Sequence, residues 1–103
     1  MVKVNVIHWQ GVASPTEAEI RRILEAEGLS AYKWSNGPGD VYGAHDHPYH
    51  KVIYVVQGSI TFGLPDTSEE ASLSQGDHLE LPAGITHDAK VGPHGVVCLE
   101  AHR

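Results

Sequence analysis

The chain has 103 residues, enough for a single domain over residues 1–103, and its 41% hydrophobic content indicates a folded globular protein. The formal net charge is −6, with only seven Lys and Arg residues and no basic block. This argues against nucleic-acid binding, which requires clustered cations to neutralise phosphates. No signal segment begins the chain, and no stretch approaches the ~20 apolar residues that cross a bilayer. We therefore expect a soluble cytoplasmic protein without a membrane partner.

The first third of the sequence predicts one strand and one helix. Residues 2–9 are predicted to form a strand, because valines alternate with polar residues. A helix is predicted over residues 15–27, where Ser14 can cap the first turn and Glu17 completes a capping box. Gly28 is expected to end it. The apolar residues of this helix fall on one face, so we expect it to pack on the outside of a sheet.

From residue 29 onward the sequence alternates short apolar runs with turn residues. Turn clusters at Gln57-Gly58-Ser59 and Gly92-Pro93-His94-Gly95 are predicted to separate neighbouring strands. With residues 2–9, this gives about nine short strands, which favours an all-β antiparallel barrel or sandwich. The further strands are expected at residues 31–35, 41–47, 51–56, 60–64, 71–74, 78–81, 85–91 and 96–101. Cys98 lies in the last run as a small core residue, and a lone cysteine excludes an intrachain disulfide.

Strand parity brings three histidines to one interior. Side chains two residues apart share a face of a strand, so Val41, His45 and His47 are expected to point the same way. His87 shares its face with apolar neighbours and is expected to point inward from a later strand. Three converging imidazoles suit a divalent transition metal (Zn, Fe, Ni, Mn or Cu) and leave open positions for a ligand. The alternative is a set of core histidines whose hydrogen bonds are made to the backbone or to water.

Two segments that contain these histidines resemble the two motifs of the cupins. Residues 39–58 carry a glycine, the His45-x-His47 pair and a closing glycine at the cupin spacing. Residues 76–91 carry Gly76, Pro82-x-Gly84 and His87 in the order of the second motif. The resemblance implies a small cupin barrel, jelly-roll-like and often dimeric, with one metal held inside by His45, His47 and His87.

Lys51 departs from the cupin pattern, which has a glutamate ligand at this position. An ammonium group cannot ligate a metal, so three outcomes are open. The three histidines can suffice, with Lys51 turned away or neutral. His50 can serve as a fourth ligand if a bulge near Pro48 turns it inward. Or Lys51 replaces the cation, and a metal-free pocket binds a small anionic ligand.

The sequence therefore supports two functions. The first is a homodimeric cupin metalloprotein with a pocket for a small polar ligand or substrate. The second is a metal-free binding module for a small anion, with Lys51 as its counter-charge. Lys51 is also the candidate catalytic residue, by imine formation with a carbonyl compound. Glu100 shares a face with Val96 and Cys98 and could approach the cavity, but we expect it to be a surface carboxylate at the end of its strand.

Overall fold

The structure, a computed structural model, describes residues 4–103. In this part of the chain, one helix and seven strands follow one another in the order β1, α1, β2 to β7. Their bounds are β1 Val6–Ile7, α1 Glu17–Ala26, β2 Tyr32–Asn36, β3 Val41–His45, β4 Lys51–Leu64, β5 Glu69–Ser74, β6 His78–Leu81 and β7 His87–His102.

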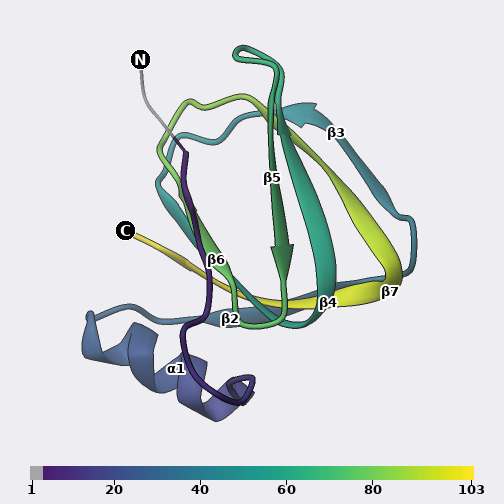
Figure 1. The fold of residues 1–103 in the computed structure, drawn as a ribbon. Coiled ribbons are helices and arrows are strands. Elements are labelled where there is room, and N and C mark those ends of the chain that lie inside the picture. The colour runs from purple at the N-terminus through teal and green to yellow at the C-terminus, as the bar shows by residue number, and fades with distance from the viewer. Residues whose placement is uncertain (1–3) are drawn as a thin grey trace.

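The strands form one antiparallel sheet that curves around a common interior (Figure 1). The order along the sheet is β1-β6-β4-β7-β2, with β5 added to β4 and β3 added to β7. The two longest strands, β4 and β7, pair with each other. β5 and β6 pair with β4, β2 and β3 pair with β7, and β1 pairs with β6. The predicted all-β antiparallel barrel with one N-terminal helix is confirmed.

The predicted turns at residues 57–59 and 92–95 are wrong, because each lies within a continuous strand. The pairing of β4 with β7 shifts register between Val55 and Gln57 and again between Gly58 and Ile60. Gly58 adopts a φ of 81°, and a Cβ at this position would collide with the carbonyl oxygen of Gly95. The glycines therefore permit bulges and close approach of two backbones, so the strands bend without ending.

The start of the helix also differs from the prediction. Thr16, not Ser14, is the N-cap: its hydroxyl accepts a hydrogen bond from the Glu19 backbone N–H at 3.1 Å. The Glu19 carboxylate accepts one from the Thr16 backbone N–H at 3.1 Å, which completes the capping box. The predicted strand over residues 2–9 reduces to Val6–Ile7 within the described residues, and its first two residues lie outside them.

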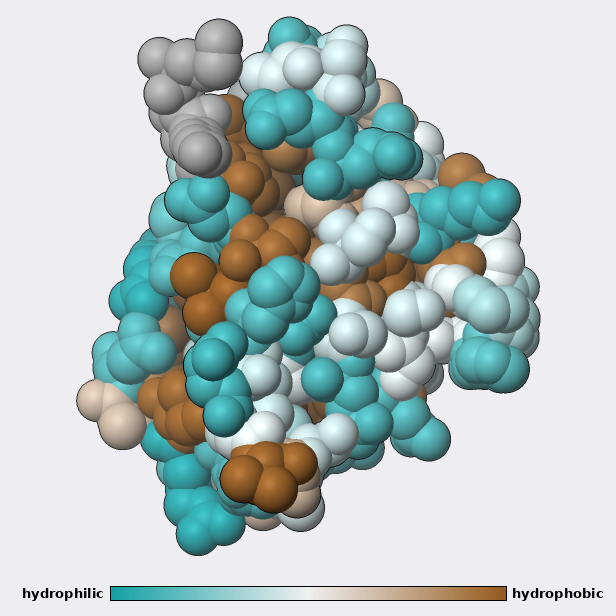
Figure 2. Space-filling model, viewed as in Figure 1, coloured by the Kyte–Doolittle hydropathy of each residue, from teal (hydrophilic) through white to brown (hydrophobic). Residues whose placement is uncertain are grey.

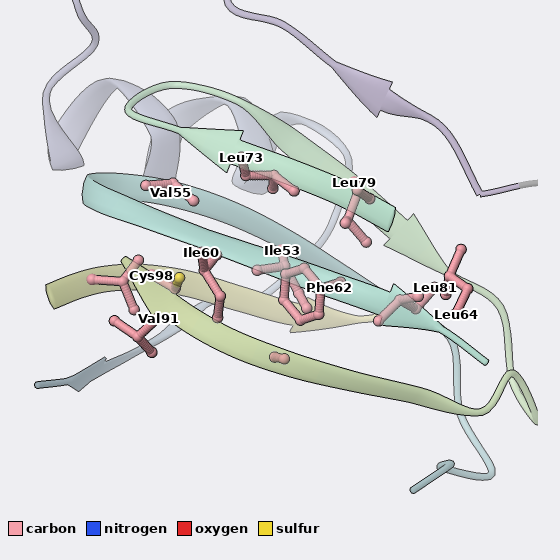
Figure 3. Close-up of a cluster of buried hydrophobic side chains, with 13 residues drawn as sticks. Ile53, Val55, Ile60, Phe62, Leu64, Leu73, Leu79, Leu81, Val91 and Cys98 are labelled. Atoms are coloured by element: carbon pink, nitrogen blue, oxygen red, sulfur yellow. The ribbon is translucent and has the colours of Figure 1, made fainter. Parts of the chain in front are cut away.

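Two hydrophobic clusters hold these elements together. The larger one fills the interior of the barrel, where Ile53, Ile60 and Phe62 lie between the strands (Figure 3). The smaller one joins the outer face of β4 and β7 to α1, through fully buried Ile20 and Leu24. Alternate residues of β4 therefore serve different clusters, as expected for a strand with two buried faces.

On the face shown in Figure 2, hydrophilic side chains divide the hydrophobic surface into separate areas. Among residues 4–103, the large hydrophobic side chains that are exposed are Ile7, Val12, Tyr32, Val41 and Tyr42. In residues 4–103, no helix has both the length and the apolar character needed to span a membrane.

Candidate metal centre

The three histidines predicted to converge lie together at one end of the barrel interior. His45 on β3 is the direct cross-strand partner of His87 on β7, and their ring centroids are 4.4 Å apart. His47 follows in the β3–β4 loop, 4.8 Å from His45 and 5.4 Å from His87. One nitrogen from each ring lies within 4.8 Å of the others, a spacing compatible with a shared metal ion.

A bulge in β3 sets the direction of these side chains. Tyr42 pairs with Ala89, and His45 pairs with His87, so β3 has one more residue than β7 between the two pairs. The extra residue changes which side chains of β3 face inward on either side of the bulge. Val41 is therefore 70% exposed instead of pointing inward as parity predicted. Tyr42 lines the interior pocket instead.

Hydrogen bonds fix the loop that carries His47. The Gly84 backbone N–H donates to the His47 carbonyl at 2.8 Å, which ties the loop to the turn before β7. The Tyr49 ring stacks on the His47 ring at 5.2 Å, and its hydroxyl lies 3.3 Å from His47 Nδ1. The third ligand candidate is thus held by backbone and aromatic contacts although it lies outside a strand.

The hydrogen-bonding state of the imidazoles suits metal ligation. Nδ1 of His45 lies 2.6 Å from the Gly43 carbonyl, and Nδ1 of His87 lies 2.9 Å from the Ile85 carbonyl. A carbonyl can only accept, so both Nδ1 atoms carry the proton and both Nε2 atoms present a lone pair. Nε2 of His47 is buried without a hydrogen-bond partner, the one such side-chain atom found in residues 4–103.

The surroundings also favour neutral imidazoles, which are the form that binds metals. Burial lowers the pKa of His87, although its hydrogen bond to Ile85 acts in the opposite direction. Burial likewise lowers the pKa of His47, and the positive charge of Lys51 lowers it further. Three features together fit a Zn, Fe, Ni, Mn or Cu ion: the unpartnered nitrogen of His47, the tautomers fixed at His45 and His87, and a donor set made of nitrogen atoms alone.

A pocket of about 250 Å³ opens beside the histidines. One side, called the apolar wall below, consists of Ile53, Ile60, Phe62 and Ala89. Phe62 contacts His87 edge to face, with ring centroids 6.4 Å apart. The remaining lining residues carry polar groups or aromatic rings: Tyr32, Trp34, Tyr42, His45, Lys51, His87 and Glu100.

Glu100 is 3% exposed, so its prediction as a surface residue is wrong. Its strand is covered on both sides, with Tyr32 of β2 and Ile53 of β4 as direct neighbours. Pairing on both flanks cannot be seen from one segment of sequence. The available signal was parity, which places Glu100 on the same face as Cys98.

The Glu100 carboxylate has partners on both oxygens. Oε1 accepts from Trp34 Nε1 at 3.1 Å, and Oε2 accepts from the Tyr32 hydroxyl and from His102 Nε2 at 2.8 Å. Lys51 Nζ lies 3.4 Å from Oε2. Burial alone would raise the pKa of Glu100, but these hydrogen bonds and the Lys51 charge outweigh it and lower the pKa. Lys51 and Glu100 thus form a buried ion pair in the pocket.

His50, the possible fourth ligand, lies outside the histidine cluster. Its Nε2 is 2.6 Å from Glu80 Oε1, and Arg103 Nε contacts the same oxygen at 3.0 Å. The Arg103 backbone N–H also donates to the His50 carbonyl at 3.0 Å. His50 therefore helps to attach the end of the chain to the β3–β4 loop.

Comparison with known proteins shows which protein family and which solved structures this chain is similar to. Residues 33–98 match the sequence profile of the family described as "Cupin domain". No curated protein sequence gives a significant match. Among solved structures, KdgF from Halomonas sp. is 32% identical, with a TM-score of 0.58 over 72% of this chain and 68% of that one.

Two further structures show the same fold. An RmlC-like cupin from Shewanella frigidimarina NCIMB 400 is 26% identical, with a TM-score of 0.62 over 72% of this chain and 64% of that one. A DUF861 family protein from Thermotoga maritima is 16% identical, with a TM-score of 0.65 over 98% of this chain and 100% of that one. Because the family profile spans most of the barrel, the chain belongs to the cupin domain family.

Proposed function

We propose that the protein binds one divalent transition metal through His45, His47 and His87, beside a pocket for a small polar ligand. The observation that carries this proposal is the buried, unpartnered Nε2 of His47 next to the two other imidazoles. A buried polar nitrogen without a partner costs about 1–3 kcal/mol, and ligation of a metal would remove this cost. The backbone hydrogen bonds of His45 and His87 leave their second nitrogens free for the same role.

A bound metal would supply Lewis-acid chemistry at the end of the pocket. The protein's own residues would hold the ion, and the apolar wall would exclude water from the ligand's side. Lys51 stays the candidate catalytic residue, because its amine faces the same pocket. We also propose a homodimer, as the cupin resemblance implies.

The metal-free alternative relies on Lys51 as an uncompensated counter-charge for an anion. The contact with Glu100 supports the metalloprotein instead, because the carboxylate offsets the charge of the lysine. Without a metal the two groups sum to zero, and the pocket would have no net attraction for an anion.

The proposal is tested by elemental analysis of protein purified without chelators and titrated with Zn²⁺, Fe²⁺, Ni²⁺, Mn²⁺ and Cu²⁺. We expect about one equivalent of a transition metal per chain and a large loss on His47→Ala or His87→Ala. His50→Ala and His94→Ala are the matched controls, since neither side chain belongs to the cluster. Less than about a tenth of an equivalent, with no uptake on titration, would contradict the proposal.

A further inference from the structure

Lys51 lines the pocket, and the N–H donors of its ammonium group are available to a ligand. Its side chain is 13% exposed, and its nearest charged partner is Glu100 Oε2 at 3.4 Å. Within residues 4–103 the structure gives Lys51 Nζ this ion pair and no hydrogen bond. An ammonium carries three N–H donors, so Lys51 can donate to a ligand in the pocket without losing an existing hydrogen bond.

Glu100 has the opposite character, because its oxygens are already in use. Trp34 donates to one oxygen, and Tyr32 and His102 donate to the other. A carboxylate held in this way has little capacity left for a ligand. Glu100 is therefore a positioning residue: its contact with Nζ holds the Lys51 side chain in the lining of the pocket.

The sum of charges then decides what kind of ligand fits. Lys51 and Glu100 cancel, an imidazole that ligates a metal does so in its neutral form, and a divalent metal would therefore bring the pocket to a charge of +2. The rest of the lining consists of the apolar wall and the aromatic side chains of Tyr32, Trp34 and Tyr42. At about 250 Å³ the pocket lies below the ~300–1,000 Å³ range of drug-sized ligand sites, so the ligand is small.

Resting on the proposed metal site, we propose that the pocket selects a short-chain carboxylate. Its carboxylate accepts hydrogen bonds from Lys51 in front of the histidines, and its hydrocarbon chain lies along the apolar wall. The selectivity for a negative charge depends on the metal, because only the metal makes the pocket positive. A metal-free anion site would behave differently, because Lys51 alone would attract the ligand and removal of the metal would not abolish the selectivity.

Butanoate and butanamide test this inference, since they share size and shape and differ in charge. The metal content of each sample is measured first, and both compounds are then titrated calorimetrically into Zn²⁺-loaded and metal-free protein. We expect butanoate to bind the loaded protein at least ~10-fold more tightly than butanamide, from charge-assisted hydrogen bonds. We expect this preference to vanish without metal.

Variants at position 51 assign the preference to Lys51. Lys51→Met should weaken butanoate binding ~10- to 100-fold and butanamide binding by less, because a neutral amide oxygen is a weaker acceptor than a carboxylate, while Lys51→Arg should retain most of the preference. Lys33→Met removes an exposed lysine that pairs with Glu17 and should change neither affinity. If Lys51→Met does not fold, the ratio of butanoate to butanamide affinity in the wild type still decides the question.

The outcomes separate the two proposals. If the metal binds and butanoate shows no preference over butanamide, or Lys51→Met leaves the preference intact, the inference is wrong and the metal site stands. If no metal binds, the proposed function fails at the first measurement. Lys51-dependent butanoate binding to that metal-free protein would then support the anion-binding module and overturn the metal-dependent selectivity.

Discussion

Removal of the buried carboxylate of Glu100 is expected to be strongly destabilising. The change Glu100→Ala leaves Lys51, Tyr32 and Trp34 without their common acceptor in the pocket. Loss of one partner of a buried ion pair typically costs ~3–5 kcal/mol, because the other charge is left unpaired. We therefore expect a decrease of this order in the free energy of unfolding, measured by urea denaturation at pH 7.

Two variants show whether the lost pairing is the cause. Glu25→Ala removes an exposed carboxylate from α1 and should change stability by less than ~0.5 kcal/mol. In the double variant Lys51→Met/Glu100→Gln, no unpaired charge remains, and we expect it to be more stable than Glu100→Ala. If Glu100→Ala unfolds at the same urea concentration as the wild type, the ion pair makes no net contribution to folding.

The sequence was informative at the residues where two independent signals agreed. For His45, His47 and His87, motif spacing and strand parity both indicated one interior, and the structure brings the three rings together. Parity alone failed at Val41, because a bulge of one residue reverses which side chains face inward. The burial of Glu100 was not predicted because it depends on strands β2 and β4. Its direct neighbours there, Tyr32 and Ile53, are 68 and 47 residues away in sequence.

At the scale of elements, the helix shows how similar sequence signals compete. Ser14 and Glu17, and Thr16 and Glu19, both have the three-residue spacing of a capping box. The structure uses the second pair, with both reciprocal hydrogen bonds present. Spacing cannot distinguish the two pairs, and the outcome depends on where Ile20 and Leu24 must sit to reach β4 and β7.

This choice of cap predicts different effects for two neighbouring substitutions. Thr16→Ala should reduce the free energy of unfolding by ~0.5–2 kcal/mol, because the Glu19 backbone N–H loses its acceptor. Ser14→Ala is the matched control and should change it by less than ~0.5 kcal/mol. Thermal denaturation followed by circular dichroism measures both. A larger effect at Ser14 than at Thr16 would show that the helix starts earlier than described.

The long strands show a similar limit of local sequence. Residues 57–59 and 92–95 have the composition of turns, and nothing within either segment shows that it lies opposite the other. In the barrel, Gly58 is the cross-strand partner of Val96, and the backbone of Gly95 passes close by. Glycine serves a turn and a close approach of two strands equally well, so only the assembled sheet decides between them.

At the scale of the whole molecule, Asp77 joins segments that are far apart in sequence. It lies in the turn between β5 and β6, with only 5% of its surface exposed. Oδ1 accepts from the backbone N–H of Trp9 at 3.2 Å, and Oδ2 accepts from that of Ser74 at 3.0 Å. His8 Nδ1 lies 3.2 Å from Oδ2. The carboxylate thus fastens the N-terminal segment to the barrel.

These contacts make part of the stability depend on pH. Burial acts to raise the pKa of Asp77, but the hydrogen bonds from Ser74 and Trp9 outweigh it, so the pKa is lowered below the ordinary value of 3.8. A carboxyl group with a lowered folded-state pKa contributes stability above its unfolded-state pKa. The contribution is lost as the pH falls through the folded-state value.

The variant Asp77→Asn should therefore be less stable than the wild type at pH 7, by ~1–3 kcal/mol, because Asn provides one acceptor oxygen and no charge. As the pH is lowered from 7 to about 2, the wild-type Asp77 becomes protonated and the difference should shrink. Urea denaturation at a series of pH values measures it, with the exposed Asp66→Asn as control. A difference that stays constant down to pH 2 would show that the hydrogen-bond geometry matters and the charge of Asp77 does not.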